Sequence, residues 1–381
     1  MASFGEPMEE ILPTGLAWEE KTMWHDTGLY FGPKAVSYWI EPIVSPENVD
    51  CKRRIKNLLD AAGLTEQLIA LKVEPASDTD LLAVHSKNHL QYIKDTSSSG
   101  GGNVAKQFGT TRVGENGFEI AALAAGAAIS CVKAVMSGAV NNAYALIRPP
   151  GHHADAEQSM GFCVFNNAAI AASFALRDHE LERVAFVDWD VHHGNGTQSI
   201  FWNDDRVLTI SIHQDNCFPP DSGSLSEVGG KKALGSCLNI PLPPGSNESV
   251  YLTAFERVIL PALRKFKPDF IFVPCGFDAG FHDPLGRMML RSESFRKLTK
   301  MIKEIAEELC EGRLVMTHEG GYSPHSVPFH ALAVFEELSG IDTNIIDPYG
   351  NTGNCEVSKL LRHEEDVISA AENLLLYVPE G

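Results

Sequence analysis

Short apolar runs that alternate with longer helical patterns constrain the fold of this chain more than any other feature. The runs are rich in β-branched residues and end at polar or glycine-rich corners: 143–147, 184–187, 207–212, 270–273 and 314–317. Because they are apolar throughout, they predict strands buried on both faces. Helical patterns cover 117–137, 168–177, 250–266 and 294–310. The alternation predicts an α/β fold with a parallel sheet and helices on both of its faces.

Composition and charge exclude several function classes. The chain has 381 residues, of which 44% are hydrophobic and 21% are charged, as in a soluble globular protein. Its 31 Lys and Arg against 50 Asp and Glu give a net charge of −19. This excess argues against direct nucleic-acid binding and favours cationic substrates. No run of about 18 apolar residues is evident, so we expect no membrane partner.

The cysteines and the N-terminus bear on the compartment. The eight cysteines are scattered without a CxxC pair, which is typical of reduced thiols and argues against a cysteine-based zinc site. The first 18 residues, MASFGEPMEEILPTGLAW, predict neither a secretory signal nor a transit peptide. We therefore expect a cytoplasmic or nuclear location.

Two further segments are predicted to be loops. Residues 30–51 are aromatic and contain prolines, and they are apolar enough to wall a cleft. Residues 96–103, TSSSGGGN, predict a mobile surface loop. No repeat or low-complexity linker divides the chain into separate domains.

Clusters of polar residues follow four of the predicted strands. They are RPPGHH at 148–153, DWDVHH at 188–193, PCGFD at 274–278 and HEGGY at 318–322. The carboxyl ends of parallel strands meet at one edge of the sheet, where ligand sites form. The four clusters are therefore expected to converge on one crevice.

Three of these residues have the chemistry of a catalytic metal site. Asp190 and His192 are two residues apart, so their side chains point to the same side of an extended backbone. Asp278, from another strand end, supplies a third ligand. Two carboxylates and one imidazole with an open position are typical of catalytic zinc rather than structural zinc.

Other residues of the clusters suit proton transfer and oxyanion stabilisation. His152 and His153 follow Pro-Pro-Gly, which bends the chain so that both rings can point inward. Imidazole exchanges a proton near neutral pH, as metal-assisted hydrolysis requires. Tyr322 follows Gly320-Gly321 and offers a phenol that can donate to a developing oxyanion.

Together, RPPGHH, GFCVFNN (161–167), VDWDVHHGNGTQ (187–198), GFDAGFHDPLG (276–286) and EGGY (319–322) resemble the zinc-dependent histone deacetylase family. The resemblance extends over about residues 20–340 and implies a single catalytic domain for 1–381. Asn195 is similar to class II, since class I members usually carry Asp there. The implied fold is the arginase-deacetylase α/β/α sandwich, three layers with a mainly parallel sheet of about eight strands.

The resemblance assigns the chemistry of the site. It implies one Zn²⁺ held by Asp190, His192 and Asp278, with Tyr322 on the acetyl oxygen. Asp188 is then the partner that orients His152, and Asn195 is the weaker partner of His153. Because Asn195 removes a charge beside His153, the division of acid and base work between the two histidines stays open.

The resemblance also implies a second cation site and a substrate tunnel. Residues of the monovalent site, for K⁺ or Na⁺, are Asp188, Asp190, His192, Ser211 and Ile212. The tunnel walls correspond to Gly161, Phe162 and Phe218. Leu285 stands where the acetylpolyamine specialist of class II has a glutamate at the tunnel mouth, so leucine favours lysine-type substrates.

The family implies hydrolysis of an N-acetyl group to acetate and a free amine. The expected substrates are acetyl-lysine of histone or other proteins, or else small N-acetylamines such as acetylpolyamines. A ureohydrolase with two Mn²⁺ is disfavoured, since its second-metal carboxylates would fall at Gly194 and Gly280. A catalytically silent acyl-lysine-binding scaffold is the alternative from another class. The sequence is compatible with a homo-oligomer.

Overall fold

The computed structural model describes residues 13–28, 38–39, 41, 43–106, 111–350 and 359–381. In this part of the chain, eight strands form one sheet in which every pairing is parallel. From one edge to the other they are β2 (Ile69–Leu71), β1 (Thr14–Ala17), β5 (Asn142–Ala145), β10 (Leu314–His318), β9 (Phe270–Cys275), β6 (Val184–Asp188), β7 (Val207–Gln214) and β8 (Cys237–Leu242). The predicted parallel α/β sheet of about eight strands is confirmed.

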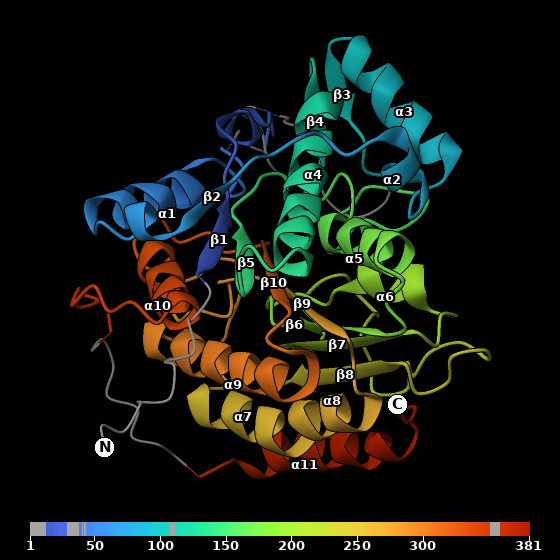
Figure 1. Ribbon diagram of the computed structural model, residues 1–381, viewed down its shortest axis with the longest axis vertical. Helices are drawn as coiled ribbons and strands as arrows, with labels where there is room; N and C mark the ends of the chain where they lie inside the picture. The colour runs from blue at the N-terminus through green and yellow to red at the C-terminus, as the bar shows by residue number, and fades with distance from the viewer. Residues whose placement is uncertain (1–12, 29–37, 40, 42, 107–110, 351–358) are drawn as a thin grey trace, which may run out of the picture.

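Helices cover both faces of this sheet (Figure 1). One face carries α2 (Asp78–Leu82), α3 (Lys87–Ser98), α4 (Gly117–Met136), α5 (Asn167–Asp178) and α6 (Asn195–Phe201). The other carries α1 (Asp50–Ala61), α7 (Glu248–Ala254), the π-helical turn η3 (Phe255–Ile259), α8 (Leu260–Phe266), α9 (Ser292–Cys310), α10 (Val327–Ser339) and α11 (Arg362–Asn373). Short 3₁₀ turns are η1 (Glu20–Trp24), η2 (Thr65–Gln67) and η4 (Leu374–Leu376). The molecule is thus a three-layer sandwich.

The strands fit between the two helical layers because apolar side chains alternate between the faces. In β6, Val184 and Phe186 pack into the core with α4 and α5, whereas Ala185 and Val187 pack into the core on the α7–α11 side. Period-two alternation of apolar residues buries both faces of the strand. This explains why the run 184–187 contains no polar residue.

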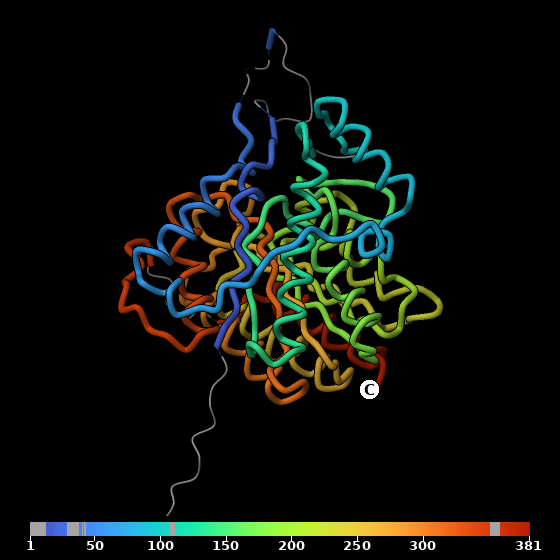
Figure 2. The backbone as a smooth tube through the Cα atoms, turned by 45° about the horizontal axis from the view of Figure 1, so that its top comes forward, coloured from blue at the N-terminus to red at the C-terminus, as the bar shows by residue number. Residues whose placement is uncertain are grey.

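Helices from both ends of the chain pack side by side in the layer that contains α7 to α11, which we call the α9 face. Helix α1, from the N-terminal part, packs beside α10, from the C-terminal part (Figures 1 and 2). The contact brings the first turn of α1 close to the loop that follows β10. That loop carries Tyr322, whose ring lies beneath the Lys52 ammonium of α1.

Helix α4 corrects one expectation from the sequence. Within the described residues it alone has the length and apolar composition to cross a membrane. The expectation that no run is long enough was therefore wrong. However, most of this helix is buried, and α4 packs on the sheet and on α5. Its apolar surface is accounted for by the protein core.

The two predicted loops also differ from the structure. Residues 96–98 end α3, and β3 (Gly101–Asn103) pairs antiparallel with β4 (Arg112–Gly114). The prediction of a mobile loop over 96–103 was wrong, because Ser97 is buried and its Oγ accepts a hydrogen bond from the Phe118 backbone. In the predicted loop 30–51, residues 30–37, 40 and 42 lie outside the described residues. Its last two residues begin α1.

The close packing of the segment around Glu74 against Gly126 of α4 predicts an effect on stability. A Cβ at Gly126 would lie 1.8 Å from the Glu74 carbonyl oxygen. We expect Gly126→Ala to lower the free energy of unfolding by about 1–3 kcal/mol through overpacking, although Ala is the better helix former. Ser130→Ala, one turn along the same helix and partly buried, is the control and should change stability much less. Chemical denaturation of both variants measures this; an unchanged Gly126→Ala would contradict the packing argument.

Candidate active site

The four polar clusters meet at the carboxyl edge of the sheet. Asp188 is the last residue of β6, Cys275 of β9 and His318 of β10, and the RPPGHH segment follows β5 closely. These strands are neighbours in the order β5-β10-β9-β6. The convergence that the sequence predicts is therefore present in the structure.

Asp190, His192 and Asp278 place one ligand atom each within 4.8 Å of one another. His192 Nδ1 lies 3.0 Å from Asp190 Oδ1 and 3.2 Å from Asp278 Oδ2. All three side chains are buried, and the 3.2 Å approach lacks hydrogen-bond geometry, which leaves Asp278 Oδ2 without a donor among the described residues. A buried carboxylate oxygen without a donor is costly. The donor set therefore fits a bound cation, which would neutralise both carboxylates.

Two glycines allow the loops to approach these carboxylates closely. A Cβ at Gly320 would lie 2.1 Å from Asp278 Oδ2, and a Cβ at Gly276 would lie 2.2 Å from Asp190 Oδ2. The Gly320 amide donates a hydrogen bond of 2.9 Å to Asp190 Oδ2. Any larger residue would displace the carboxylates from these positions.

His152 and His153 lie beside this group, and both are buried. His152 Nδ1 is 3.0 Å from Asp188 Oδ2, and His153 Nδ1 is 2.7 Å from Asn195 Oδ1. The two rings are 3.9 Å apart at their centroids. The structure thus places Asp188 and Asn195 at the two histidines as the resemblance implied, and each fixes the orientation of one ring.

The two histidines have opposite electrostatic environments. Burial alone would lower the pKa of His152, but the Asp190 and Asp188 carboxylates outweigh it and raise the pKa to about 10. Burial, together with the neighbouring His152 and His192, holds the pKa of His153 well below its usual value. A cation at Asp190 would reduce the difference, since it offsets that carboxylate.

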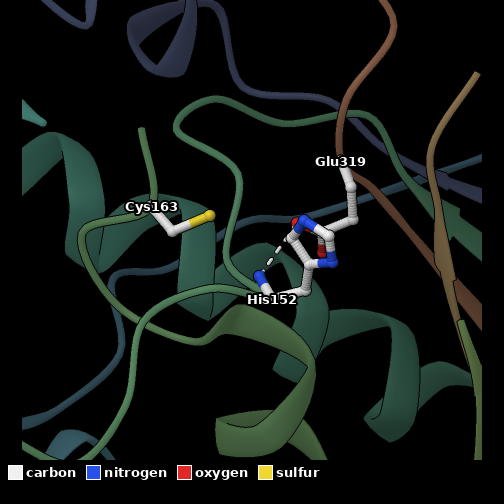
Figure 3. A group of neighbouring side chains, drawn as sticks. All are labelled: His152, Cys163 and Glu319. Carbon is white, nitrogen blue, oxygen red and sulfur yellow. Dashed lines mark hydrogen bonds between the residues drawn. The ribbon is translucent and has the colours of Figure 1, made fainter. Parts of the chain in front are cut away.

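A second group of potential ligands is formed by His152, Cys163 and Glu319 (Figure 3). Each places one potential ligand atom within 4.8 Å of those of the other two. Its atoms already have partners. Glu319 Oε2 accepts from the Gly151 and His152 amides, and the Cys163 thiol donates to the Gly161 carbonyl. Burial raises the pKa of Glu319 to about 7 and that of Cys163 well above its usual value. These contacts hold the RPPGHH segment in place, a role that the sequence reasoning missed although Glu319 follows a strand end.

Tyr322 lies on the loop after β10, two residues beyond the Gly320 amide that bonds Asp190. Its backbone amide donates a hydrogen bond of 2.7 Å to Asp283 Oδ2. Burial first, and then the Asp278 and Asp190 charges, keep the pKa of its phenol well above the usual value. The phenol is therefore a hydrogen-bond donor rather than a phenolate.

The predicted tunnel residues flank this group. The Phe162 ring lies 5.9 Å from that of Tyr322, and the Phe218 ring lies 4.9 Å from that of His153. Gly161 has φ +54°, and a Cβ there would come within 2.3 Å of His153 and 2.9 Å of Phe218. The glycine lets the aromatic walls close around the histidine. The wall function itself stays a prediction.

Leu285 is half-buried, and Cys217 lies beside it. The Cys217 Sγ is 3.8 Å from the Leu285 carbonyl oxygen. Cys217 is only partly buried, unlike the other cysteines that the structure describes. Sequence reasoning missed Cys217, because its only signal is its position directly before Phe218.

The residues expected to hold a monovalent cation lie at and just after the end of β6 and in the middle of β7. Asp188 and Ser211 are register partners, and Ser211 Oγ accepts from the Gly194 amide at 3.4 Å. Ile212, Asp190 and His192 are buried around them. The cation itself stays a prediction.

Gly194 and Gly280 stand where ureohydrolases would carry the carboxylates of a second metal. Neighbouring atoms fill the space beside both glycines. A Cβ at Gly194 would lie 2.3 Å from Asp188 Oδ2, and a Cβ at Gly280 would lie 2.7 Å from His330 Nε2. Neither position has room for a carboxylate side chain. The second-metal ligand set of a ureohydrolase therefore does not fit this chain.

Comparison with known proteins agrees with this geometry. The family model of the histone deacetylase domain matches residues 45–338. The chain belongs to the histone deacetylase family. It is 46% identical to the histone deacetylase-like amidohydrolase of Pseudomonas aeruginosa over 338 residues, 88% of each chain. It is 39% identical to a probable deacetylase of Archaeoglobus fulgidus over 308 residues, 79% of this chain and 84% of that one.

The fold of this chain is similar to that of a solved structure. The crystal structure of the HDA15 HD domain matches with a TM-score of 0.82 and 30% sequence identity. The match covers 96% of this chain and 94% of that chain. The family membership and the fold thus rest on independent comparisons of sequence and of structure.

Proposed function

We propose that this chain is a zinc-dependent deacetylase that removes the acetyl group from acetyl-lysine of proteins. The observation that carries the proposal is the buried group of Asp190, His192 and Asp278, with one Asp278 oxygen left without a donor. These three residues would hold one Zn²⁺. When bound, the ion would polarise the acetyl carbonyl and activate a water for attack.

The protein residues around the metal group have separate tasks. The Tyr322 phenol donates to the acetyl oxygen as negative charge develops on it. One histidine of the His152–His153 pair takes the proton of the attacking water, and a histidine then gives a proton to the departing amine. Asp188 and Asn195 keep the two rings in orientation for this transfer. The products are acetate and a primary amine.

The apolar walls explain which part of a substrate enters. Phe162 and Phe218 flank the buried group, and Gly161 leaves room between them. Such walls suit the aliphatic chain of acetyl-lysine and exclude bulk water from the reacting amide. Leu285 adds a further apolar residue, which favours protein substrates.

We also propose a cytoplasmic or nuclear location, in keeping with the scattered free cysteines.

A second candidate is deacetylation of small cationic N-acetylamines. The net charge of −19 favours it, because a negative field steers cations toward the protein. A turnover panel of acetyl-lysine peptides and acetylpolyamines with zinc-loaded protein distinguishes the two substrate classes. The absence of turnover with every acetylated substrate would favour the scaffold alternative instead.

The metal proposal predicts one zinc per chain. Asp278→Ala should lose both the metal and the activity, because only two ligands remain. Asp269→Ala, a change of the same kind away from the site, is the control and should retain the zinc. Elemental analysis of the purified proteins measures this. Two zinc ions per active chain would overturn the single-metal proposal.

The oxyanion role of Tyr322 predicts a different result. Tyr322→Phe removes only the phenol oxygen, so the variant should retain one zinc while kcat falls by about 10²–10³-fold. Steady-state kinetics combined with metal analysis tests this. A variant that keeps most of its kcat would show that the phenol does not act on the reacting carbonyl.

The position of Leu285 predicts a shift in substrate preference. Leu285→Glu places a carboxylate at this partly exposed site, which should attract the free amine of acetylspermidine. We expect the ratio of kcat/KM for acetylspermidine over an acetyl-lysine peptide to rise about five-fold, as expected for ~1 kcal/mol of a partly exposed ion pair. Leu285→Gln controls for polarity without charge. An unchanged or reversed ratio would exclude a gating role for this position.

A further inference from the structure

Lys52, in the first turn of α1, is a fully buried lysine close to the site. Its side chain is 1% exposed, and its ammonium lies 3.0 Å from Glu47 Oε1. The same ammonium lies over the ring of Tyr322, 5.7 Å from the centroid. A buried ammonium is costly unless its contacts repay the loss of water. The contacts of Lys52 therefore call for a specific explanation.

Neutralising Glu47 is not a sufficient explanation, because Arg148 already does so. Arg148 Nε donates to Glu47 Oε1 at 2.9 Å, and Arg148 Nη2 donates to Glu47 Oε2 at 2.7 Å. This is a two-point pairing of guanidinium and carboxylate, the strongest form of such a contact. Burial would raise the pKa of Glu47, but Arg148 and Lys52 outweigh it and hold the pKa well below its usual value. One carboxylate therefore faces two buried cations, and Lys52 supplies an excess positive charge.

That excess charge faces a ring whose position matters for the reaction. Tyr322 follows two glycines, and Gly321 has φ +121°, a backbone conformation that glycine adopts far more readily than other residues. The Asp283 carboxylate holds the Tyr322 amide, and Phe162 contacts the ring from its own segment. The Lys52 ammonium is the charged group placed over the ring face, where the negative part of the aromatic quadrupole attracts a cation.

We propose that Lys52 is a positioning residue, which holds the Tyr322 ring by a cation–π contact so that the phenol points at the reacting carbonyl. Glu47 fixes the ammonium in place. Through Arg148, the same Glu47 also holds the start of the segment that carries His152 and His153. One buried carboxylate thus connects the tyrosine and the histidine segments. This inference rests on the proposed deacetylase function.

A double-mutant cycle separates this role from a general one. Lys52→Met keeps the length of the side chain, removes the charge and leaves the Glu47–Arg148 pair intact. We expect kcat to fall roughly ten-fold while KM and zinc content change little, because the phenol acts in the transition state. In the Tyr322→Phe background, Lys52→Met should cause no further loss. An equal loss in both backgrounds would show a structural or long-range effect and would overturn the proposal.

The chain offers a matched control on the same helix. Lys56 lies one turn after Lys52, and its ammonium lies over the Trp18 ring at 5.9 Å from the centroid. Lys56→Met removes a cation–π contact of the same kind, but not one with Tyr322. It should leave kcat within two-fold of the wild type. Lys52→Gln, which can still donate to Glu47, repeats the cycle with a polar neutral side chain if Lys52→Met does not fold.

A spectroscopic measurement tests the contact without any turnover. In protein labelled with ¹³Cζ-tyrosine, the Tyr322 resonance is assigned by its loss in Tyr322→Phe. It should shift in Lys52→Met and Lys52→Gln, and it should not shift in Lys56→Met. An unshifted resonance in a folded Lys52 variant, or a variant that retains wild-type kcat, would overturn the proposal. A wild-type protein without deacetylase turnover would contradict the proposed function instead, and the spectroscopic result would stand apart from it.

Discussion

The buried negative charge of Asp190 and Asp278 is the constraint on which the rest of the site depends. Both carboxylates are fully buried beside His192, so backbone donors must replace part of the water that they lose, and the three side chains together fit a bound cation. The Gly320 amide supplies one such donor to Asp190, and the Val191 amide supplies one to Asp278. Only glycine at 320 lets the loop come close enough. The loops after β6, β9 and β10 are therefore fixed relative to one another by the same charges.

A second buried charge cluster connects this centre to the helices outside the sheet. Glu47 pairs with Arg148, and the Arg148 Nη1 also donates to the Met23 and His25 carbonyls. The histidine segment is thus joined to the chain before α1, while Lys52 joins α1 to the tyrosine loop. Polar contacts in a water-free interior are strong and directional, so they restrict the positions of the catalytic groups. The helices of the α9 face in this way contribute to the geometry of the site.

The sequence predicted the central strands of the sheet and missed those toward its two edges. Strands β5, β6, β7, β9 and β10 have apolar runs that identify them. Strand β1, TGLA, contains a glycine and no β-branched apolar residue, and β2 has only three residues, so neither has such a run. Strand β8 contains Asn239 and Pro241, and proline is tolerated there because β8 is an edge strand. Helix α4 was predicted, but its membrane-like length was not recognised, and only its packing shows that this surface is part of the core.

The sequence by itself determined which polar residues gather at the carboxyl edge of the sheet, because covalent spacing and strand ends place them there. Asp190 and His192 are two residues apart, and Asp278 follows a neighbouring strand, so their convergence needs only the rule for parallel sheets. The tertiary structure decided the contacts between segments distant in the chain. The Lys52 ammonium over the Tyr322 ring and the Glu47–Arg148 pair depend on how α1 packs beside the sheet. No local pattern encodes such contacts, because packing between distant segments and not covalent spacing sets their distances.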